Sequence, residues 1–254
     1  ANFLVGLDAD TPLFWLGTGT NLLVRDGGIP GVVIFAGRML RHLDRFGALS
    51  VRAGAGVPCT QLARQCIRWH LGPSEFFAGI PGTVGGALAM NAGAHGGETW
   101  ERVASVRTID RAGELHDRNP DDYEIGYRSV KGPDNEWFLE AILQFDPDVK
   151  PSMEAMKSMH ERRKNTQPLG LQSCGSVFRN PPGDHSARLI EAAGLKGFRI
   201  GGAEVSTKHA NFIINQDGAT ASDIERLIEH VQTTVHDVHG IELMHEVRIV
   251  GEAT

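Results

Sequence analysis

The sequence predicts a mixed α+β protein in two parts, on the basis of three features. Short runs of β-branched and aliphatic residues, each bounded by turn residues, predict strands throughout the first part. A charged segment, residues 151–164, has methionines along one stripe and predicts a helix at the boundary. The last third combines short strands with a long amphipathic helix from about Ala221 to His239. We therefore expect one domain over residues 1–148 and a smaller one over residues 149–254.

The composition excludes several classes of protein. Hydrophobic residues make up 41% and charged residues 22% of the 254 residues, which is typical of a globular chain. The net charge of -6 argues against nucleic acid as a partner. Three cysteines without a CxxC pair favour a reduced, cytoplasmic protein over a disulfide framework. No apolar run reaches membrane-spanning length, so we expect no membrane partner.

The first part is predicted to contain six short strands and one clear helix. The helix opens at Pro58, where a missing N–H costs nothing, and Leu62, Cys66 and Trp69 follow the helical period. A hairpin is expected around residues 111–113. The predicted strands are residues 13–16, 31–35, 49–53, 103–109, 114–117 and 137–145, and residues 22–24 form a further apolar segment.

The second part is predicted to contain two helices between its strands. One helix covers residues 186–193 and is closed by Gly194. The long helix carries Ser222 and Glu225 at the spacing of a capping box. The predicted strands are residues 176–178, 211–215 and 247–250.

Two glycine-rich loops are candidates for binding a ligand. Residues 17–21 follow a strand directly, and such a turn can present several N–H groups to a pyrophosphate. Leu22 stands where a Rossmann fingerprint has its third glycine, so that fold is excluded, and a plain hairpin turn remains an alternative. Residues 78–98 are more specific, because Pro81 and Gly82 at a helix start direct N–H groups toward an anion. A close helix–sheet crossing is the alternative for the glycines that follow.

Residues 78–98 resemble the flavin-binding signature of the UDP-N-acetylenolpyruvoylglucosamine reductase family. Residues 16–31 resemble the same family, and the resemblance continues in order through 126–129, 174–181 and 246–251. It implies a FAD-binding domain of the vanillyl-alcohol-oxidase (PCMH) type, followed by a smaller α+β substrate-binding domain. The chain resembles the shorter, second type of this reductase. Only fifteen residues precede Leu16, so we expect the FAD-binding domain to be incomplete at its N-terminus.

The resemblance also implies an activity. A member of this family reduces UDP-N-acetylglucosamine enolpyruvate to UDP-N-acetylmuramate with NADPH, through FAD, in peptidoglycan precursor synthesis in the cytoplasm. We expect the protein to be a monomer. By the resemblance, the residues that contact FAD are Gly17, Thr18, Gly19, Thr20, Asn21, Leu22, Gly79, Pro81, Gly82, Thr83, Gly85, Gly86, Ala87 and Asn91.

Three residues match the catalytic residues of the family. Arg128 matches the arginine that holds and polarises the substrate carboxylate, and its planar fork suits bidentate contact. Ser176 matches the serine that protonates C2 of the alkene. Glu246 matches the glutamate that assists at the carboxylate, and we expect it in a strand, where burial would raise its pKa. A loop arginine, a turn serine and a solvent-facing carboxylate are the ordinary alternatives.

Asn180, Gln167 and His95 are further candidates for substrate contacts. Cys174 is predicted to be a small buried thiol, because no His–Asn or His–Asp arrangement accompanies it as in a nucleophile site.

No metal is predicted, because His236 and His239 lack further residues at ligand spacing. Two rival functions remain at this point. One is another FAD oxidoreductase of the same fold, and the other is a truncated, non-catalytic nucleotide-sugar-binding remnant.

Overall fold

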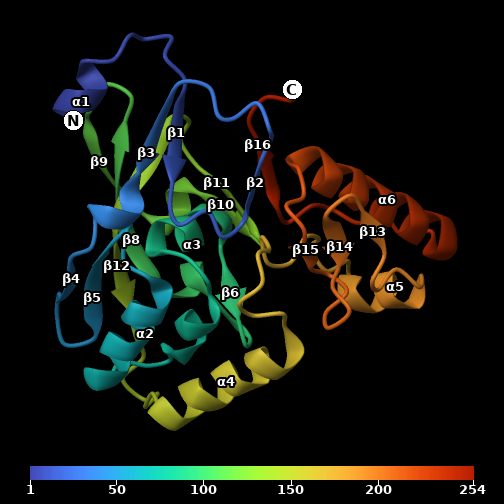
Figure 1. Cartoon of the computed structure of the whole chain (residues 1–254). Helices are drawn as coiled ribbons and strands as arrows, with labels where there is room; N and C mark the ends of the chain where they lie inside the picture. Colours follow the sequence, from blue (N-terminus) through green and yellow to red (C-terminus); the bar gives the residue numbers. More distant parts are fainter. The chain divides into compact units, whose positions relative to one another are not determined.

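The computed structural model describes residues 1–254, which form two compact units. The first unit contains residues 1–18 and 31–162, and the second contains residues 19–30 and 163–254. Figure 1 shows the elements of both units, coloured along the sequence. The mixture of helices and short strands is that of the predicted α+β class.

The first unit is built around a five-stranded antiparallel sheet in the order β4-β5-β12-β8-β9. In β5, Val51 and Ala53 are buried while Ser50 and Arg52 are not, as the twofold period of a strand requires. The buried side chains pack with those of helices α2 and α3 in one apolar core. The bounds are β4 Leu43–Arg45, β5 Ser50–Gly54, β8 Val103–Asp110, β9 Leu115–Arg118, β12 Glu136–Gln144, α2 Cys59–Arg68 and α3 Val84–Met90.

Helix α2 begins one residue later than predicted. Pro58 is its N-cap, with extended backbone, and Trp69 is its C-cap. Leu62 and Cys66 are fully buried. The apolar period therefore identified the buried face of this helix correctly.

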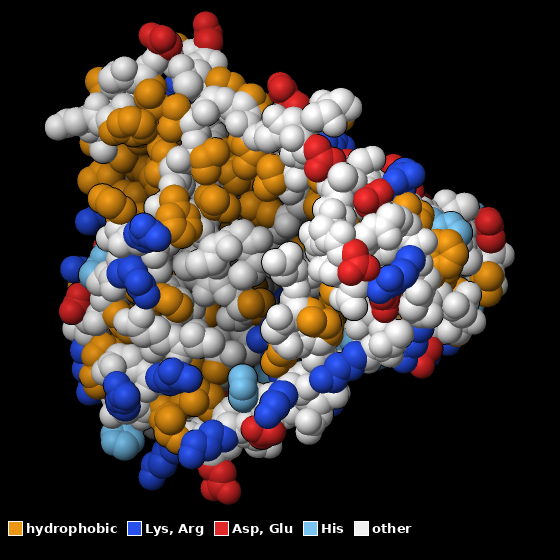
Figure 2. All heavy atoms as spheres, viewed as in Figure 1, with side chains coloured by type: hydrophobic (Ala, Val, Ile, Leu, Met, Phe, Trp, Pro, Cys, Tyr) orange, Lys and Arg blue, Asp and Glu red, His pale blue; other side chains and the backbone are white.

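Smaller elements complete the first unit. Strands β1 and β3 form a parallel pair, and Figure 2 shows hydrophobic side chains gathered over this part, where Phe3, Val33 and Phe35 are exposed. Two hairpins, β6–β7 and β10–β11, follow α3 in the chain. The bounds are α1 Asn2–Val5, β1 Leu13–Leu16, β3 Val32–Phe35, β6 Gly93–Ala94, β7 Gly97–Glu98, β10 Glu124–Gly126, β11 Ser129–Lys131, and the 3₁₀ helices Ala36–Arg38, Glu75–Gly79, Thr99–Arg102 and Pro120–Asp122.

The second unit packs helices α5 and α6 with a three-stranded sheet, β13-β14-β15. The segment 19–30 joins this unit because β2 pairs in parallel with β16. Arg25 also donates to both oxygens of the Glu225 carboxylate of α6, with Nε–Oε2 and Nη2–Oε1 distances of 3.1 and 2.9 Å. The bounds are β2 Leu22–Val24, α5 Ser186–Ala192, β13 Arg199–Ile200, β14 Ala203–Val205, β15 Ile213–Asn215, α6 Ala221–His239 and β16 Arg248–Val250.

The division into units differs from the predicted boundary at residues 148/149. It falls inside helix α4, Met153–Thr166, after Arg162. Met156 explains the difference, because its buried side chain belongs to the core of the first unit. The assignment of residues 19–30 to the second unit depends on a strand pairing across more than 200 residues, which no local pattern reveals.

Two local predictions in the second unit were wrong. The capping box of α6 is formed by Thr220 and Asp223, not by Ser222 and Glu225. Residues 176–178 do not form a strand, because only Phe178 makes an isolated bridge, to His245. The length of α6 itself, Ala221–His239, agrees with the prediction. None of the helices has the length and apolar character needed to cross a bilayer.

Candidate functional site

The two glycine loops meet within the first unit at Thr83. A Cβ built on Gly17 would lie 2.9 Å from Thr83 Oγ1, and one built on Gly86 would lie 3.9 Å from the same atom and near nothing else. Thr83 is buried, whereas Gly86 is exposed. Gly17 therefore packs against Thr83 with no room for a side chain, whereas the exposed backbone at Gly86 leaves space for the close approach of a flat or anionic group such as FAD.

Other residues of the second loop have structural roles. The N–H groups of Val84 and Gly85 donate to the carbonyls of Val57 and Ala55, at 2.9 and 2.8 Å, and fix the start of α3. A Cβ on Gly85 would lie 2.9 Å from that of Ala55, so this glycine permits a close crossing of backbones. Ala87 is 2% exposed and lies in the core. The contacts of Gly85 and Ala87 are therefore those of a close helix–sheet crossing, the alternative interpretation of this loop.

Pro81 and Gly82 lie at the turn before α3. Pro81 is exposed, and Gly82 has a φ of +109°, which favours glycine. Gly79 ends the 3₁₀ helix Glu75–Gly79 and faces the ring of His95, since a Cβ there would be 2.9 Å from His95 Cδ2. His95 is itself exposed and has a φ of +52°.

Asn91 is a hydrogen-bonding hub at the end of α3. It adopts the left-handed conformation, with a φ of +45°, and is 2% exposed. Its Nδ2 donates to Glu98 Oε2 at 2.8 Å and to the Gly126 carbonyl at 3.1 Å. Its Oδ1 accepts from the Trp100 N–H at 3.1 Å. Both amide donors of this predicted FAD residue are thus used to join the segments around Arg128.

Arg128 occupies a strained turn. Gly126 pairs with Ser129, so Tyr127 and Arg128 form the two-residue connection of the β10–β11 hairpin. Arg128 has a φ of +52°, a conformation that favours glycine or asparagine at this position. A bulky side chain held in such a conformation is an indication of function.

The guanidinium of Arg128 is held by main-chain carbonyls. Nη1 donates to the Asn91 carbonyl at 3.2 Å, and Nη2 donates to the Gly93 carbonyl at 2.8 Å. The Glu98 carboxylate lies 3.9 Å from Nη1, and the Arg128 side chain is 16% exposed. The side chain also lies over the Tyr127 ring, at 5.1 Å from its centroid. Arg128 is therefore a positioned group and not a mobile surface arginine.

Ser176 and Glu246 lie together in the second unit. The N–H of Glu246 donates to the carbonyl of Val177, the residue after Ser176, at 2.8 Å. Asn21 Nδ2 donates to the Glu246 carbonyl at 2.9 Å, which brings the first glycine loop to the same place. A Cβ on Gly175 would lie 4.0 Å from the Thr20 carbonyl. Three segments that are far apart in the sequence thus meet at Ser176.

Glu246 is not in a strand, contrary to the prediction. It lies two positions before the first residue of β16, Arg248, and is half-buried. The strand cannot include it because its N–H and that of Val247 both donate to the Val177 carbonyl. The predicted apolar neighbour Val247 is buried.

Cys174 is a poor nucleophile in this environment. Burial raises the pKa of its thiol to about 11, and the negative charge of Glu246 contributes to this rise. The thiol is therefore neutral near pH 7. Cys174 is only partly buried, which differs from its prediction as a buried residue.

The first loop is divided between the two units. Gly17 and Thr18 belong to the first unit, whereas residues 19–22 belong to the second. Asn21 binds Glu246, as described above, and Leu22 pairs with Arg248 in the parallel β2–β16 ladder. Whether residues 19–22 contact FAD stays a prediction.

Two predicted substrate residues have protein partners. Asn180 Oδ1 accepts from the N–H of Ser186, at the start of α5, at 3.1 Å. Gln167 Oε1 accepts from Arg163 Nε at 2.7 Å. The roles of Asn180 and Gln167 at the substrate stay predictions.

Sequence reasoning assigned no role to Glu98. It closes the β6–β7 hairpin opposite Gly93, and its carboxylate is close to both Asn91 and Arg128. The available signal was its place at the end of the glycine-rich run, seven residues after an asparagine that follows a helix.

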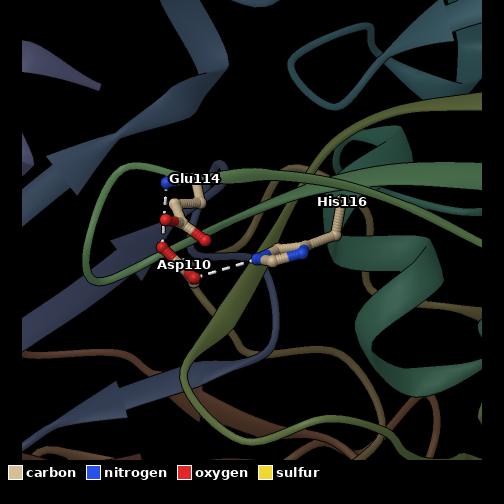
Figure 3. A group of neighbouring side chains, drawn as sticks. All are labelled: Asp110, Glu114 and His116. Carbon is tan, nitrogen blue, oxygen red and sulfur yellow. Dashed lines mark hydrogen bonds and ion pairs between the residues drawn. The ribbon is translucent and has the colours of Figure 1, made fainter.

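One cluster with metal-ligand residue types lies on the β8–β9 hairpin. Asp110, Glu114 and His116 place one possible ligand atom each within 4.8 Å of one another (Figure 3). His116 Nε2 lies 2.9 Å from Asp110 Oδ2, and the Glu114 N–H donates to Asp110 Oδ1 at 2.9 Å. These contacts account for the cluster as a hydrogen-bonded turn, and we retain the prediction of no metal.

Comparison with known proteins identifies the family and supports the fold. The family model of the FAD binding domain matches residues 7–118, and that of the UDP-N-acetylenolpyruvoylglucosamine reductase C-terminal domain matches residues 167–250. The reductase of that name from Alkalilimnicola ehrlichii is 58% identical over 99% of this chain and 84% of its own length. That from Methylococcus capsulatus is 54% identical, over 99% of this chain and 83% of its own length.

A solved structure has the same fold. The crystal structure of UDP-N-acetylenolpyruvylglucosamine reductase from Thermus caldophilus matches 95% of this chain and 86% of that chain, with a TM-score of 0.82 and 33% identity. Sequence and structure thus agree over almost the whole length. The chain belongs to the UDP-N-acetylenolpyruvoylglucosamine reductase family and is a flavin-dependent oxidoreductase.

Proposed function

We propose that this protein reduces UDP-N-acetylglucosamine enolpyruvate to UDP-N-acetylmuramate, a precursor of peptidoglycan, with NADPH as the reductant. The relatives that carry the reductase name are 49–58% identical to the chain, and their names supply the substrate class. The match to the FAD binding domain supplies the cofactor class. The meeting of Ser176 with Glu246 through the Val177 carbonyl is the structural observation that carries the proposal.

The reaction requires charge stabilisation on an unsaturated acid. Addition of hydride at C3 of the enolpyruvyl group leaves negative charge at C2, delocalised into the carboxylate. A fixed positive group at that carboxylate stabilises this charge as it develops. The glycine loops at Gly17, Thr83 and Gly86 would hold FAD, which would supply the hydride-transfer chemistry between NADPH and C3.

Arg128 is suited to bind the substrate carboxylate. A guanidinium presents a planar set of N–H donors that matches the two carboxylate oxygens. The carbonyls of Asn91 and Gly93 hold this plane, at 3.2 and 2.8 Å. Because these acceptors are neutral, the positive charge of Arg128 is not cancelled by them.

Ser176 is proposed to deliver the proton to C2. A hydroxyl is a weak acid, but the carbanionic C2 is a strong base, so a positioned hydroxyl can donate to it. Gly175 has a φ of +78° and lacks a side chain, which leaves the approach to Ser176 open on that side. Glu246 is proposed to assist at the substrate carboxylate, since its N–H bond to the Val177 carbonyl holds it beside the Ser176 segment.

The proposal is tested by separating the two half-reactions in stopped-flow measurements of flavin absorbance. We expect Ser176→Ala to be reduced by NADPH at the rate of the unsubstituted protein and to be reoxidised by the enolpyruvyl substrate at least about 1000-fold more slowly. Ser173→Ala is the matched control, because Ser173 is an exposed serine three residues away. It should leave both rates unchanged.

The same experiment distinguishes the rival functions. An equal loss of both half-reactions in Ser176→Ala would contradict a role as proton donor. A purified protein that lacks flavin absorbance but binds UDP-N-acetylglucosamine would indicate the non-catalytic remnant. A flavin that is reduced by NADPH but not reoxidised by the enolpyruvyl substrate would indicate an oxidoreductase with another substrate.

A further inference from the structure

The hairpin β6–β7 places a carboxylate beside the arginine of the site. Gly93 and Glu98 are partners in the hairpin, so the residue whose carbonyl accepts from Arg128 lies opposite the residue whose carboxylate faces it. A Cβ on Gly93 would be 3.1 Å from both Arg128 Nη1 and Glu98 Cγ. Arg128 and Glu98 thus approach each other across a position that has no space for a side chain.

The two oxygens of Glu98 have different environments. Oε2 accepts from Asn91 Nδ2 at 2.8 Å, whereas Oε1 lies 3.9 Å from Arg128 Nη1, beyond hydrogen-bonding distance. Asn91 in turn binds the Gly126 carbonyl, two residues before Arg128, at 3.1 Å. Asn91 therefore connects the Glu98 carboxylate with the backbone of the turn that carries Arg128.

This geometry differs from other arginine–carboxylate contacts in the same unit. Arg107 binds Asp117 with two hydrogen bonds, at 2.8 and 3.0 Å. Such a bidentate contact occupies the face of the guanidinium that would bind another carboxylate. Glu98 is instead held back by Asn91 and is near enough to orient the positive charge without forming that contact.

We infer that Glu98 is a positioning residue for Arg128. Glu98 acts through Asn91 to fix the Arg128 guanidinium, which receives the substrate carboxylate. This inference rests on the proposed function, because it assigns the arginine to the enolpyruvyl carboxylate. It adds that recognition of this carboxylate depends on Glu98 accepting the hydrogen bond of Asn91.

Binding measurements test the inference without turnover. In isothermal titration of the oxidised protein, we expect Glu98→Ala to bind UDP-N-acetylglucosamine enolpyruvate about tenfold more weakly, as small misplacements of a binding group cost this much or more. Its affinity for UDP-N-acetylglucosamine should not change, because that compound lacks the carboxylate. Glu98→Gln should recover most of the affinity, because its amide oxygen can still accept from Asn91.

A matched control and a double substitution complete the design. Asp117→Asn removes the carboxylate partner of another arginine, Arg107, and should bind both compounds normally. In an Arg128→Lys background, Glu98→Ala should have little further effect, because a positioning residue has no function without the group it positions. Flavin content and melting temperature of each variant identify loss of folding.

The outcomes separate this inference from the proposed function. If the unsubstituted protein does not bind the enolpyruvyl compound more tightly than UDP-N-acetylglucosamine, the proposed function fails. If it does, and Glu98→Ala binds both compounds as the unsubstituted protein does, the positioning role is refuted. Equal weakening toward both compounds, or a Gln variant as weak as the Ala variant, would also refute it.

Discussion

The buried amide of Asn91 offers a quantitative test of how the first unit is held together. In Asn91→Ala, the Trp100 N–H loses its acceptor at 3.1 Å, and Trp100 is only 5% exposed. An unsatisfied buried N–H costs about 1–3 kcal/mol. The left-handed conformation, with a φ of +45°, costs an alanine about 1–2 kcal/mol more. We expect a total loss of about 2–5 kcal/mol in the free energy of unfolding.

The other two contacts of Asn91 contribute less to this loss. The Gly126 carbonyl belongs to an exposed residue, and the Glu98 side chain is 32% exposed. Water can replace the amide at both acceptors, so neither remains fully unsatisfied. The expected loss is therefore dominated by Trp100 and by the backbone conformation.

The assay is urea unfolding followed by circular dichroism, at one fixed excess of FAD, with the apparent stability of each variant corrected for its own FAD dissociation constant because Asn91 is a predicted FAD contact. Asn91→Gly is the matched control, because it loses the same hydrogen bonds but adopts a positive φ without strain. It should be more stable than Asn91→Ala by about 1 kcal/mol. A glycine variant less stable than the alanine variant, or an alanine variant that loses less than about 1 kcal/mol, would refute the reasoning.

Three further predictions concern other parts of the chain. In Arg128→Gly, reoxidation of the reduced flavin by substrate should be far slower. Its melting temperature should fall little, because glycine adopts the φ of +52° in this turn without strain and this offsets the loss of the side-chain contacts. A large fall in melting temperature would contradict this. Alkylation of Cys174 by iodoacetamide should be slow at pH 7 and rise about tenfold per pH unit toward its pKa of about 11, since burial and the Glu246 charge disfavour the thiolate; rapid labelling at pH 7 in the folded protein would contradict it. Thr220→Ala should lower the free energy of unfolding by about 1 kcal/mol, because it removes the cap of α6. Ser222→Ala should change this free energy little. Equal effects of the two substitutions in urea unfolding would favour the capping box that was expected from the sequence.

Several features of the fold were predictable because they depend on neighbours in the chain. Helix α6 has the predicted bounds, since its apolar period runs over 19 residues and ends at Gly240 in the left-handed conformation. The strands flanking residues 111–113 form the predicted hairpin. The glycine loops were identified as sites of close backbone approach, and Gly17, Thr83 and Gly86 lie together as such a site requires.

The N-terminal cap of α6 could not be predicted from neighbouring residues alone. Glu225 has the spacing of a capping residue, but its carboxylate binds Arg25, which is 200 residues away. The side chain of Asp26 accepts the N–H groups of Ala221 and Ser222 at the start of the helix. Contacts from the distant segment 19–30 thus engage Glu225 and the first N–H groups of the helix, and the capping box is formed by Thr220 and Asp223 instead.

The sequence by itself determined the periodic helices, the hairpins and the glycine loops, because these depend on residues within a few positions of each other. Only the tertiary structure decided that residues 19–30 join the second unit, that the Val177 carbonyl joins Glu246 to the Ser176 segment, and that Asn91 links Glu98 to Arg128. The physical reason is that these contacts are hydrogen bonds between distant segments. Their formation depends on how the whole backbone closes and leaves no periodic signal in the sequence.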